Sequence, residues 1–408
     1  MKDQRKHIVL IAAWFFPENR VASFRLNAFA KYLNKDKFKV TVVSLNHAKG
    51  ATQELLFDDV LVYREPYSTL VRIRKQQPGD SFLKHKLYAL NNKLVSRFSL
   101  YDYPGWTAAV VARLETIQVS NSIDLIISSY APVDAHLAAH AFKKKFPEVK
   151  WIADMRDEMS RNRFLSAQAK SKLAGIEKRI ADSIDGLTTV SAPILNDFKA
   201  LLHNTSIKYK EVRNGFDHDY PPSTNFSRQF TFLYAGTFYA QIKPDTLFAA
   251  LTSLEKLNAL EGNWTLKLLG THRNFNVPKE LVKHVHFMPP VPNEQAVGEM
   301  MAADCSILIH PPMGTHGVYS GKLFEYLSTG KPVLALVDTE DVAAKLINEM
   351  NAGEVVDFYD VDGIKKAILK IHSDWKNHNL PKVDPEKIKK LHRKHQVSLL
   401  EELIDEIL

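Results

Sequence analysis

Short apolar runs alternate with amphipathic helical segments along the whole 408-residue chain. In the first half, buried strands are predicted at 7–14, 38–45, 124–129, 151–155 and 186–191, with a helix at 24–33. In the second half, strands are predicted at 230–236, 264–270, 284–288, 305–310 and 332–337, with a helix near 245–257. This alternation is typical of doubly wound parallel sheets. The chain is therefore predicted to be an α/β protein with two Rossmann-like doubly wound parallel-sheet domains.

A stretch rich in proline and polar residues, PPSTNFSRQ at 221–229, is predicted to link the two domains. We expect an N-terminal domain at 1–220 and a C-terminal domain at 230–384. The last segment, 385–408, is expected to be helical and to cross back to the N-terminal domain. The carboxyl ends of the two sheets are expected to face a cleft, where strand-to-helix loops meet a ligand.

The net charge of +8 is unevenly distributed along the chain. Residues 1–215 hold 34 Lys and Arg against 21 Asp and Glu, whereas the remainder holds 20 against 25. This asymmetry indicates that the two halves face different partners, and that the basic half attracts an anionic acceptor or an anionic membrane surface. Charge alone does not indicate a nucleic-acid partner, because no nucleic-acid-binding module or interleaving of aromatic and basic residues accompanies it.

A single cysteine, Cys305, excludes an intramolecular disulfide framework and a cysteine-rich zinc site. The presence of only one cysteine fits a protein of the reducing cytoplasm. The apolar run HIVLIAAWFF near the start is too short to span a bilayer, and no signal peptide is recognised. We therefore expect a cytoplasmic protein that is either free or peripheral on the inner face of the membrane.

The stretch GVYSGKLFEYLSTGKPVLAL, at 317–336, combines a glycine loop with a short helix and a following strand. Ser320 is a plausible N-cap and Gly330 a plausible end of the helix. Free N–H groups around 318–322, aided by the helix dipole, favour an anion there. One turn further, Glu325 could accept two hydrogen bonds from ribose hydroxyls, so the pattern fits a nucleotide-sugar. The alternative is a surface helix with an ordinary pair between Lys322 and Glu325.

This stretch resembles the donor-site motif of retaining glycosyltransferases of family 4, which have the two-domain B-type fold. Further resemblances lie in HIVLIAAWFFPENRVASFRLNAFAKYL, in WIADMRD (a D-x-R-D variant of a bacterial subgroup), in TTVSAPILNDF with VRNGFD, and in FLYAGTFYAQIKP. The motifs occur in the family's order over nearly the whole chain. The resemblance implies a hexosyltransferase-type enzyme that moves a sugar from a nucleotide-sugar to a glycan or lipid-linked acceptor, in bacterial surface polysaccharide or glycoconjugate synthesis.

The resemblance assigns roles to individual residues of this chain. Glu325 matches the ribose-binding glutamate, and Lys243 matches a basic residue on the donor diphosphate; these two are the predicted catalytic residues. The other donor-binding residues it indicates are Gly236, Thr237, Val318, Tyr319, Ser320, Gly321 and Lys322. The chain departs from the family where Gly317 replaces a second glutamate and where Thr237 replaces an arginine. The acceptor loop at 19–23 also lacks the family's glycines.

No metal or other cofactor is expected, because lysines and main-chain amides can stabilise the leaving diphosphate. The triplet Asp217-His218-Asp219 resembles the D-x-D metal motif of another glycosyltransferase fold. Its position after NGF, beside the linker, favours an ordinary loop. His310 and His316 lie near the donor loop, where a structural or solvent-exposed histidine is the simpler interpretation.

Acceptor-side residues are expected after strand ends of the first domain, namely Arg20, Arg25, Arg156 and Asp157. Arg156 and Asp157 could equally form an internal ion pair. Arg20 and Arg25 could equally be solvated charges at the start of a helix.

A basic stretch at 64–97 carries apolar residues at helical spacing, namely Leu83, Leu87, Leu90, Leu94 and Phe98. A helix of this kind fits an anionic membrane surface, where a lipid-linked acceptor would reside. The alternative is a domain helix that buries its leucines.

Two other functions remain open from the sequence. A nucleotide-sugar epimerase of the same architecture would form product without an acceptor. A non-catalytic nucleotide-sugar-binding subunit would bind the nucleotide without transfer or hydrolysis.

Overall fold

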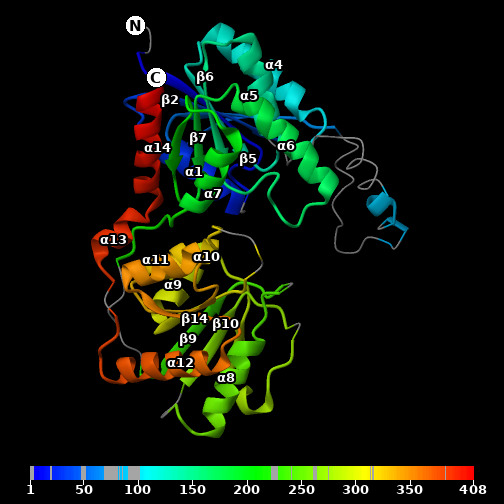
Figure 1. Cartoon of the computed structure of the whole chain (residues 1–408). Coiled ribbons are helices and arrows are strands. Elements are labelled where there is room, and N and C mark those ends of the chain that lie inside the picture. The colour runs from blue at the N-terminus through cyan, green and yellow to red at the C-terminus, as the bar shows by residue number, and fades with distance from the viewer. Residues whose placement is uncertain are drawn as a thin grey trace. The chain divides into compact units, whose positions relative to one another are not determined.

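The computed structural model describes residues 4–18, 21–46, 52–68, 81, 83–84, 86–90, 102–221, 228–239, 241–260, 264–273, 275–312, 314, 317–381 and 383–408. The chain forms two compact units (Figure 1). Unit 1 comprises Met1–Val212 and Val397–Leu408, and unit 2 comprises Arg213–Gln396.

The core of unit 1 is an eight-stranded sheet with the strand order β3-β4-β2-β1-β5-β6-β7-β8. Its strands are β1 (Lys6–Ala12), β2 (Phe38–Leu45), β3 (Gln53–Leu56), β4 (Val60–Glu65), β5 (Leu125–Tyr130), β6 (Lys150–Met155), β7 (Gly186–Thr189) and β8 (Lys208–Glu211). All neighbours pair in parallel except β3, which is antiparallel to β4. The central strands are apolar almost throughout, as expected for a sheet that is covered on both faces.

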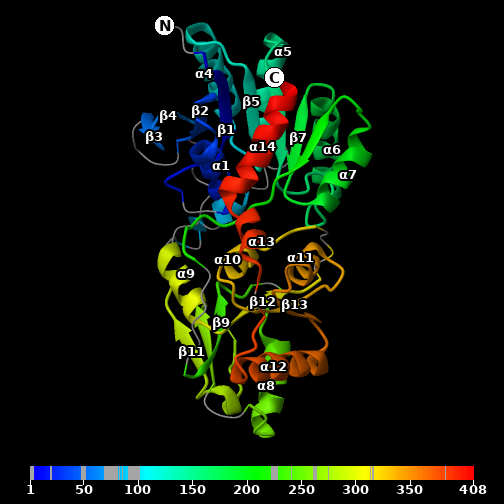
Figure 2. The ribbon, with the colours of Figure 1, turned by 90° about the vertical axis from the view of Figure 1, so that its left-hand side faces the viewer.

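Helices cover both faces of this sheet. They are α1 (Val21–Tyr32), α4 (Trp106–Ser120), α5 (Asp134–Lys145), α6 (Ala167–Ala181), α7 (Ala192–Leu202) and the end of α14 (Arg393–Ile407). Apolar residues of α1 and α14 share one core with β1, β2 and β5. Helix α14 therefore lies on the α1 side of the sheet (Figure 2). Helices α4 and α5 pack against each other and against the sheet.

The core of unit 2 is a six-stranded, fully parallel sheet with the order β11-β10-β9-β12-β13-β14. Its strands are β9 (Phe230–Ala235), β10 (Trp264–Leu269), β11 (Val285–Met288), β12 (Cys305–His310), β13 (Val333–Val337) and β14 (Gly353–Asp357). Its helices are α8 (Asp245–Lys256), η1 (Lys279–Leu281), α9 (Asn293–Ala302), α10 (Gly321–Ser328), α11 (Val342–Met350), α12 (Val361–Lys376), α13 (Pro385–Lys390) and the first residues of α14.

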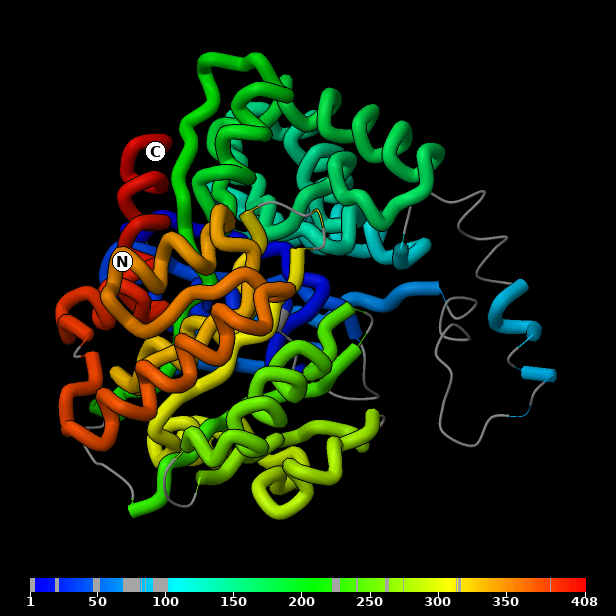
Figure 3. The backbone as a smooth tube through the Cα atoms, turned by 60° about the horizontal axis from the view of Figure 1, so that its bottom comes forward, coloured from blue at the N-terminus to red at the C-terminus, as the bar shows by residue number. Residues whose placement is uncertain are grey.

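Two separate apolar cores lie on the two faces of the unit 2 sheet. One core joins α8 and α12, which lie side by side, to residues such as Phe230 and Phe232 (Figure 3). The other joins α9, α10 and α11 to the alternate residues Leu233 and Ala235. Successive side chains of a strand point to opposite faces, so one strand serves both cores. The predicted fold class, two Rossmann-like parallel-sheet domains, is confirmed.

Several elements differ from the sequence-based expectations. The short strands β3, β4, β8 and β14 were not predicted. They lie at or near sheet edges, where half-exposed residues replace the continuous apolar runs that mark central strands. Strands β2 and β12 match their predicted bounds.

The unit boundaries also differ from the expected domain limits. Residues 213–220 group with unit 2, because Phe216 is buried in the α10–α11 core. The C-terminal segment 385–408 is divided, with its first part in unit 2 and Val397–Leu408 in unit 1. Most of the predicted linker, 222–227, lies outside the described residues.

Part of the predicted basic amphipathic helix is visible. Leu83, Leu87 and Leu90 are 73%, 60% and 57% exposed, so these three leucines are not buried in a core of this chain. Leu94 and Phe98 lie outside the described residues. Among the helices the structure describes, none is long and apolar enough to cross a bilayer.

Candidate functional site

Helix α10 begins directly after the glycine loop of unit 2. Ser320 is its N-cap, with extended backbone angles and no side-chain capping hydrogen bond. The N–H of Gly317 donates to Asp341 at 2.9 Å and fixes the loop before the helix. Gly330 follows the helix at φ +70°, as a C-terminal glycine should. The predicted start and end of this helix are therefore confirmed.

The burial of α10 explains its orientation. Leu323, Phe324 and Leu327 are fully buried in the α9–α11 core. The opposite side of the helix leaves Gly321 exposed and Lys322 and Glu325 partly exposed. The uncapped N-terminus therefore carries the positive end of the helix dipole, which favours a bound anion.

Lys322 is a partly buried cation that lacks a carboxylate partner among the described residues. Its Nζ lies 4.2 Å from the centroid of the Tyr234 ring and donates to the Tyr234 hydroxyl at 2.9 Å. Burial lowers the pKa of the Lys322 ammonium to about 8. A buried ammonium held only by an aromatic ring and a hydroxyl is suited to an anionic ligand.

Gly236, at the end of β9, makes room for this ammonium. Its φ is +117°, and a Cβ there would lie 2.6 Å from Cε and 2.7 Å from Nζ of Lys322. The Gly236 carbonyl accepts a hydrogen bond from the Thr271 hydroxyl at 2.6 Å, and Thr237 is exposed beside it. The structure thus brings together two predicted donor-binding residues from different elements, Gly236 directly after β9 and Lys322 on α10.

Lys243 lies in the loop before α8 and is exposed. Within the described residues, its side chain makes no hydrogen bond or ion pair. The predicted contact between Lys243 and a diphosphate stays a prediction.

Glu325 lies one turn after Lys322, and 12% of its side chain is exposed. Burial raises the pKa of Glu325 to about 7, although the charge of Arg393 opposes this shift. Its Oε1 lies 4.0 Å from Arg393, and its Oε2 lies 3.7 Å from His218 Nε2. Oε2 is buried and has no hydrogen-bond partner among the described residues. A carboxylate oxygen in this state fits a ligand that supplies hydroxyl donors.

His218 is a residue of this site that the sequence did not assign. Its Nε2 lies 2.8 Å from the hydroxyl of Ser328, which itself donates to the carbonyl of Glu325 at 2.6 Å. Asp217 lies 3.9 Å from Arg393, and the side chain of Asp219 is fully exposed. The triplet therefore serves as a loop beside Glu325. In the sequence, only the position of this triplet directly after the Asn-Gly-Phe motif indicated a loop.

Arg393 reaches the site because two distant segments pair inside unit 2. Phe216 forms a β-bridge with His392, and the N–H of Arg393 donates to the Phe216 carbonyl at 2.9 Å. Gly215 has φ +66°, and a Cβ there would lie 2.4 Å from the Leu391 carbonyl oxygen. Only glycine permits this close approach.

In unit 1, the predicted acceptor-side residue Arg25 is buried. It donates twice to Asp154 Oδ1, at 2.7 and 3.1 Å, and once to the Val212 carbonyl at 2.6 Å. Asp154 also accepts from the hydroxyls of Ser129 and Thr188, each at 2.7 Å. Burial alone would raise the pKa of Asp154, but Arg25 and the hydrogen bonds lower it below its usual value. Arg25 is therefore buried and paired, so the alternative that it is a solvated charge at the start of a helix is wrong.

Arg156 donates to the main-chain carbonyls of Tyr130 and Ala131. Its Nε lies 3.9 Å from Asp157, so the predicted internal ion pair is present at the limit of an ionic contact. About half of the Asp157 side chain is exposed. Arg20 lies outside the described residues, and the acceptor roles of all four residues stay predictions.

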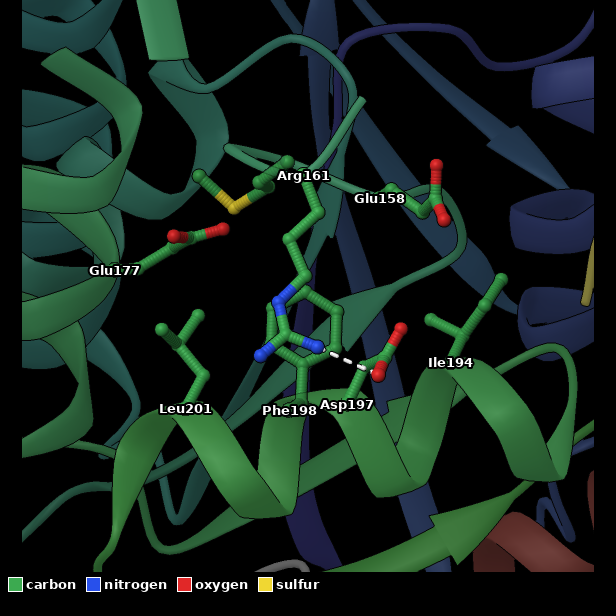
Figure 4. A pocket seen from close by; sticks show the side chains of 8 residues that line it. Glu158, Arg161, Glu177, Ile194, Asp197, Phe198 and Leu201 are labelled. Atoms are coloured by element: carbon green, nitrogen blue, oxygen red, sulfur yellow. Dashed lines mark ion pairs between the residues drawn. The ribbon is translucent and has the colours of Figure 1, made fainter. Parts of the chain in front are cut away.

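A small pocket lies beside the segment that follows β6, between α6 and α7 (Figure 4). Met159, Ile194, Phe198 and Leu201 make its apolar part. At its rim, Glu177 accepts hydrogen bonds from the N–H and the hydroxyl of Ser160, at 2.9 and 2.5 Å. These bonds hold the segment after the D-x-R-D motif against α6.

No group of three or more His, Cys, Asp or Glu side chains among the described residues is placed to hold a metal ion. Burial lowers the pKa of His310, and His316 lies outside the described residues.

Residues 229–374 match the sequence profile of the family described as glycosyl transferases group 1. This match covers the sheet of unit 2 and the helix that carries Lys322 and Glu325. Most of the unit 2 sequence is therefore similar to this family. Among curated proteins, no sequence relative of the chain is found.

Solved structures share the architecture of the whole chain at low sequence identity. One is described as trehalose-6-phosphate from E. coli bound with UDP-2-fluoro glucose, with a TM-score of 0.61, 11% identity and coverage of 98% of this chain and 99% of that one. Another is the α,α-trehalose 6-phosphate synthase from Burkholderia multivorans, with a TM-score of 0.62, 10% identity and coverage of 99% and 98%.

A third is a putative UDP-N-acetylglucosamine 2-epimerase from Listeria monocytogenes, with a TM-score of 0.57, 11% identity and coverage of 98% and 96%. At these identities the likeness defines the fold, which is the two-domain B-type glycosyltransferase architecture. A synthase and a putative epimerase share that fold, so the function must be argued from the site.

Proposed function

We propose that this protein is a glycosyltransferase that binds a nucleotide-sugar on unit 2 and transfers the sugar to a glycan or lipid-linked acceptor. The observation that carries the proposal is the presence on α10 of two partly buried charged groups that the described residues leave without a matching partner. They are the Lys322 ammonium, which has no carboxylate partner there, and Glu325 Oε2, which has no hydrogen bond there. The match to glycosyl transferases group 1 covers this helix.

The spacing of these two groups fits the two polar ends of a nucleoside diphosphate. The uncapped N-terminus of α10 and the Lys322 ammonium favour the diphosphate. Glu325, one turn further along the helix, can accept hydrogen bonds from the two ribose hydroxyls. Each of these two groups would then gain a partner that it lacks among the described residues.

The same groups can lower the barrier to sugar transfer. When the bond between sugar and diphosphate breaks, negative charge develops on the leaving diphosphate. Preorganised donors, namely the ammonium of Lys322, the amides at the start of α10 and the exposed Lys243, can stabilise that charge. The resemblance to family 4 supports a reaction that retains the anomeric configuration and that proceeds without a metal ion.

Two features of unit 1 support an acceptor that is anionic or embedded in a membrane. Residues 1–215 carry the excess of basic side chains. Leu83, Leu87 and Leu90 are exposed on a segment that also contains Lys84 and Lys86. A lipid-linked acceptor in bacterial surface polysaccharide or glycoconjugate synthesis would bring the protein to an anionic membrane surface. Sedimentation with vesicles should then require anionic lipid; equal sedimentation with purely zwitterionic vesicles would refute this part.

The donor is identified by thermal unfolding of the whole protein with a panel of uridine, guanosine, adenosine and thymidine diphosphate-sugars. We expect one of them to raise the melting temperature, because a ligand that binds only the folded state stabilises it. The Lys322→Met variant should lose this response. A matched variant at an exposed lysine of unit 2, Lys345→Met, should keep it.

The nucleotide-sugar selected in this way is then incubated with candidate acceptors. Formation of a glycosylated acceptor with release of nucleoside diphosphate supports the proposal. Conversion of the nucleotide-sugar without any acceptor would instead favour an epimerase. Binding without transfer or hydrolysis would favour a nucleotide-sugar-binding subunit.

A further inference from the structure

The carboxylate of Glu325 faces charged groups from two other segments of unit 2. His218 and Asp217 come from the segment after residue 212, and Arg393 comes from the start of α14. Glu325 Oε2 lies 3.7 Å from His218 Nε2, and Glu325 Oε1 lies 4.0 Å from Arg393 Nη2. Both distances are too long for a hydrogen bond. Charged groups therefore lie close to the Glu325 carboxylate, but its Oε2 has no hydrogen-bond partner among the described residues.

His218 cannot neutralise this carboxylate. The Ser328 hydroxyl donates a hydrogen bond to the Glu325 carbonyl, so it accepts a hydrogen bond from His218 Nε2–H. Burial lowers the pKa of His218, and the charge of His392 acts in the same direction. The imidazole is therefore neutral near pH 7 and acts as a spacer that is fixed by its bond to Ser328.

Arg393 compensates Glu325 only in part. Its guanidinium also lies 3.9 Å from Asp217, and its Nε donates to the Asn214 carbonyl at 3.1 Å. The negative charge of Asp217 further disfavours a second negative charge on Glu325. Burial, the largest cause, raises the pKa of Glu325 to about 7, so the free protein holds this carboxyl partly protonated at neutral pH.

We propose that His218 and Arg393 are positioning residues that hold Glu325 ready for a pair of hydroxyl donors, so that a nucleoside diphosphate binds with release of a proton from Glu325. This inference rests on the proposed function. Two hydroxyl donors stabilise the ionised form, because a carboxylate accepts hydrogen bonds better than a protonated carboxyl does. The proton leaves to solvent as the ribose binds.

The sign of the pH dependence follows from this linkage. Binding favours ionised Glu325, so this carboxylate should make affinity rise with pH through the range around 7, whereas loss of the Lys322 charge should lower affinity again above about 8. With a midpoint near 7, about one tenth of the sites are ionised at pH 6 and about nine tenths at pH 8. Ionisation of Glu325 alone should therefore make affinity about tenfold weaker at pH 6 than at pH 8, measured for a nucleoside diphosphate relative to its 2′,3′-dideoxy analogue, because the charge of Lys322 affects both ligands alike.

The first test is calorimetric titration of the protein with uridine, guanosine and adenosine diphosphate at pH 7, in buffers of different ionisation enthalpy. We expect the tightest of the three to release about half a proton more than its 2′,3′-dideoxy analogue. Both ligands carry the same diphosphate, so its own titration cancels in this comparison. Glu325→Gln should abolish the difference.

The second test moves the midpoint of the pH profile in both directions. Arg393→Gln should raise it by about one pH unit, since a positive charge within about 4 to 6 Å is lost, and Arg393→Lys should restore most of the shift. Asp217→Asn should lower it, because a negative charge beside Glu325 is removed. A variant that only loosens the fold would weaken binding at every pH without moving the midpoint. If Arg393→Gln does not fold, Asp217→Asn carries this test. His218→Asn changes no charge, and as a positioning variant it should weaken binding of the ribose ligand while leaving binding of the dideoxy ligand unchanged; equal weakening of both would count against a positioning role.

The outcomes separate this inference from the proposed function. Diphosphate binding that is independent of pH, with equal proton release by ribose and dideoxyribose ligands, would overturn the inference and leave the proposed function standing. If no diphosphate binds at pH 8, the proposed function fails, and the inference fails with it.

Discussion

Replacement of Lys322 by methionine should make the protein more stable while removing its response to nucleotide. The ammonium is buried against Tyr234 and next to Gly236, with no carboxylate partner among the described residues. Methionine has a similar length and flexibility but no charge, so it can fill the same space. The variant therefore separates the energetic cost of the charge from the packing of the side chain.

The size of the effect follows from the pKa of Lys322. Burial lowers this pKa from 10.5 to about 8, and each tenfold change in a protonation equilibrium equals about 1.4 kcal/mol. The charged form is thus disfavoured in the folded protein by about 3 kcal/mol. We expect methionine to recover about 1–2 kcal/mol at pH 7, because the hydrogen bond to Tyr234 and the ring contact are lost in exchange.

The pH dependence gives an independent check of the same reasoning. The folded protein gives up the Lys322 proton near pH 8, whereas an unfolded lysine keeps it to about 10.5. The unfolded state therefore binds more protons between these values, so this lysine makes stability rise with pH from 8 to 10.5. The Lys322→Met variant should lack this rise.

The assay is equilibrium unfolding in guanidinium chloride at pH 7 and at pH 10, with Lys345→Met as the exposed control. A gain of about 1–2 kcal/mol at pH 7 that shrinks at pH 10 would support the reasoning. If Lys322→Met is less stable than the parent protein at pH 7, or still gains stability from the selected nucleotide-sugar, the ammonium is not an uncompensated cation kept for an anionic ligand.

Three further variants test other parts of the structure. Lys243→Ala should lower the rate of sugar transfer by about 100-fold or more in steady-state kinetics, as loss of a donor to the leaving group does; near-normal turnover would remove Lys243 from the mechanism. Asp154→Asn leaves Arg25 buried without its counter-charge and should cost about 3–5 kcal/mol in chemical unfolding, whereas a cost below about 1 kcal/mol would show that the buried pair is dispensable. Gly353→Ala should cost about 3 kcal/mol or more, because φ is +142° and the new Cβ would lie 2.1 Å from a carbonyl oxygen of β13. The control Gly298→Ala meets open space in α9 and should be neutral or slightly stabilising.

The central strands and helix α10 could be predicted because their signals are local. Strand β12 is a short, mostly apolar run, and α10 follows its N-cap Ser320 and ends before Gly330, as capping rules require. The edge strands could not be predicted in the same way. Leu55 in β3, for example, is 68% exposed, so no core imposes an apolar pattern on that strand.

The partners of the charged side chains were beyond the reach of the sequence. Arg25 meets Asp154 across 129 residues, and His218 meets Ser328 across 110. Nothing in local propensity or periodicity links positions so far apart; the topology of the sheets brings them together. The residues around Glu325 were missed for this reason, although Glu325 itself follows from its place on α10.

The division of α14 between the two units has a consequence for how the protein is made. Leu400, Leu403 and Ile404 belong to the same apolar core as β1 and β2, yet the ribosome adds them only after all of unit 2. During synthesis, the face of the unit 1 sheet that α14 covers therefore stays partly exposed until the last residues of the chain are made. Unit 2 is contiguous in sequence and has no such delay, so the domain made second can be the first to finish folding.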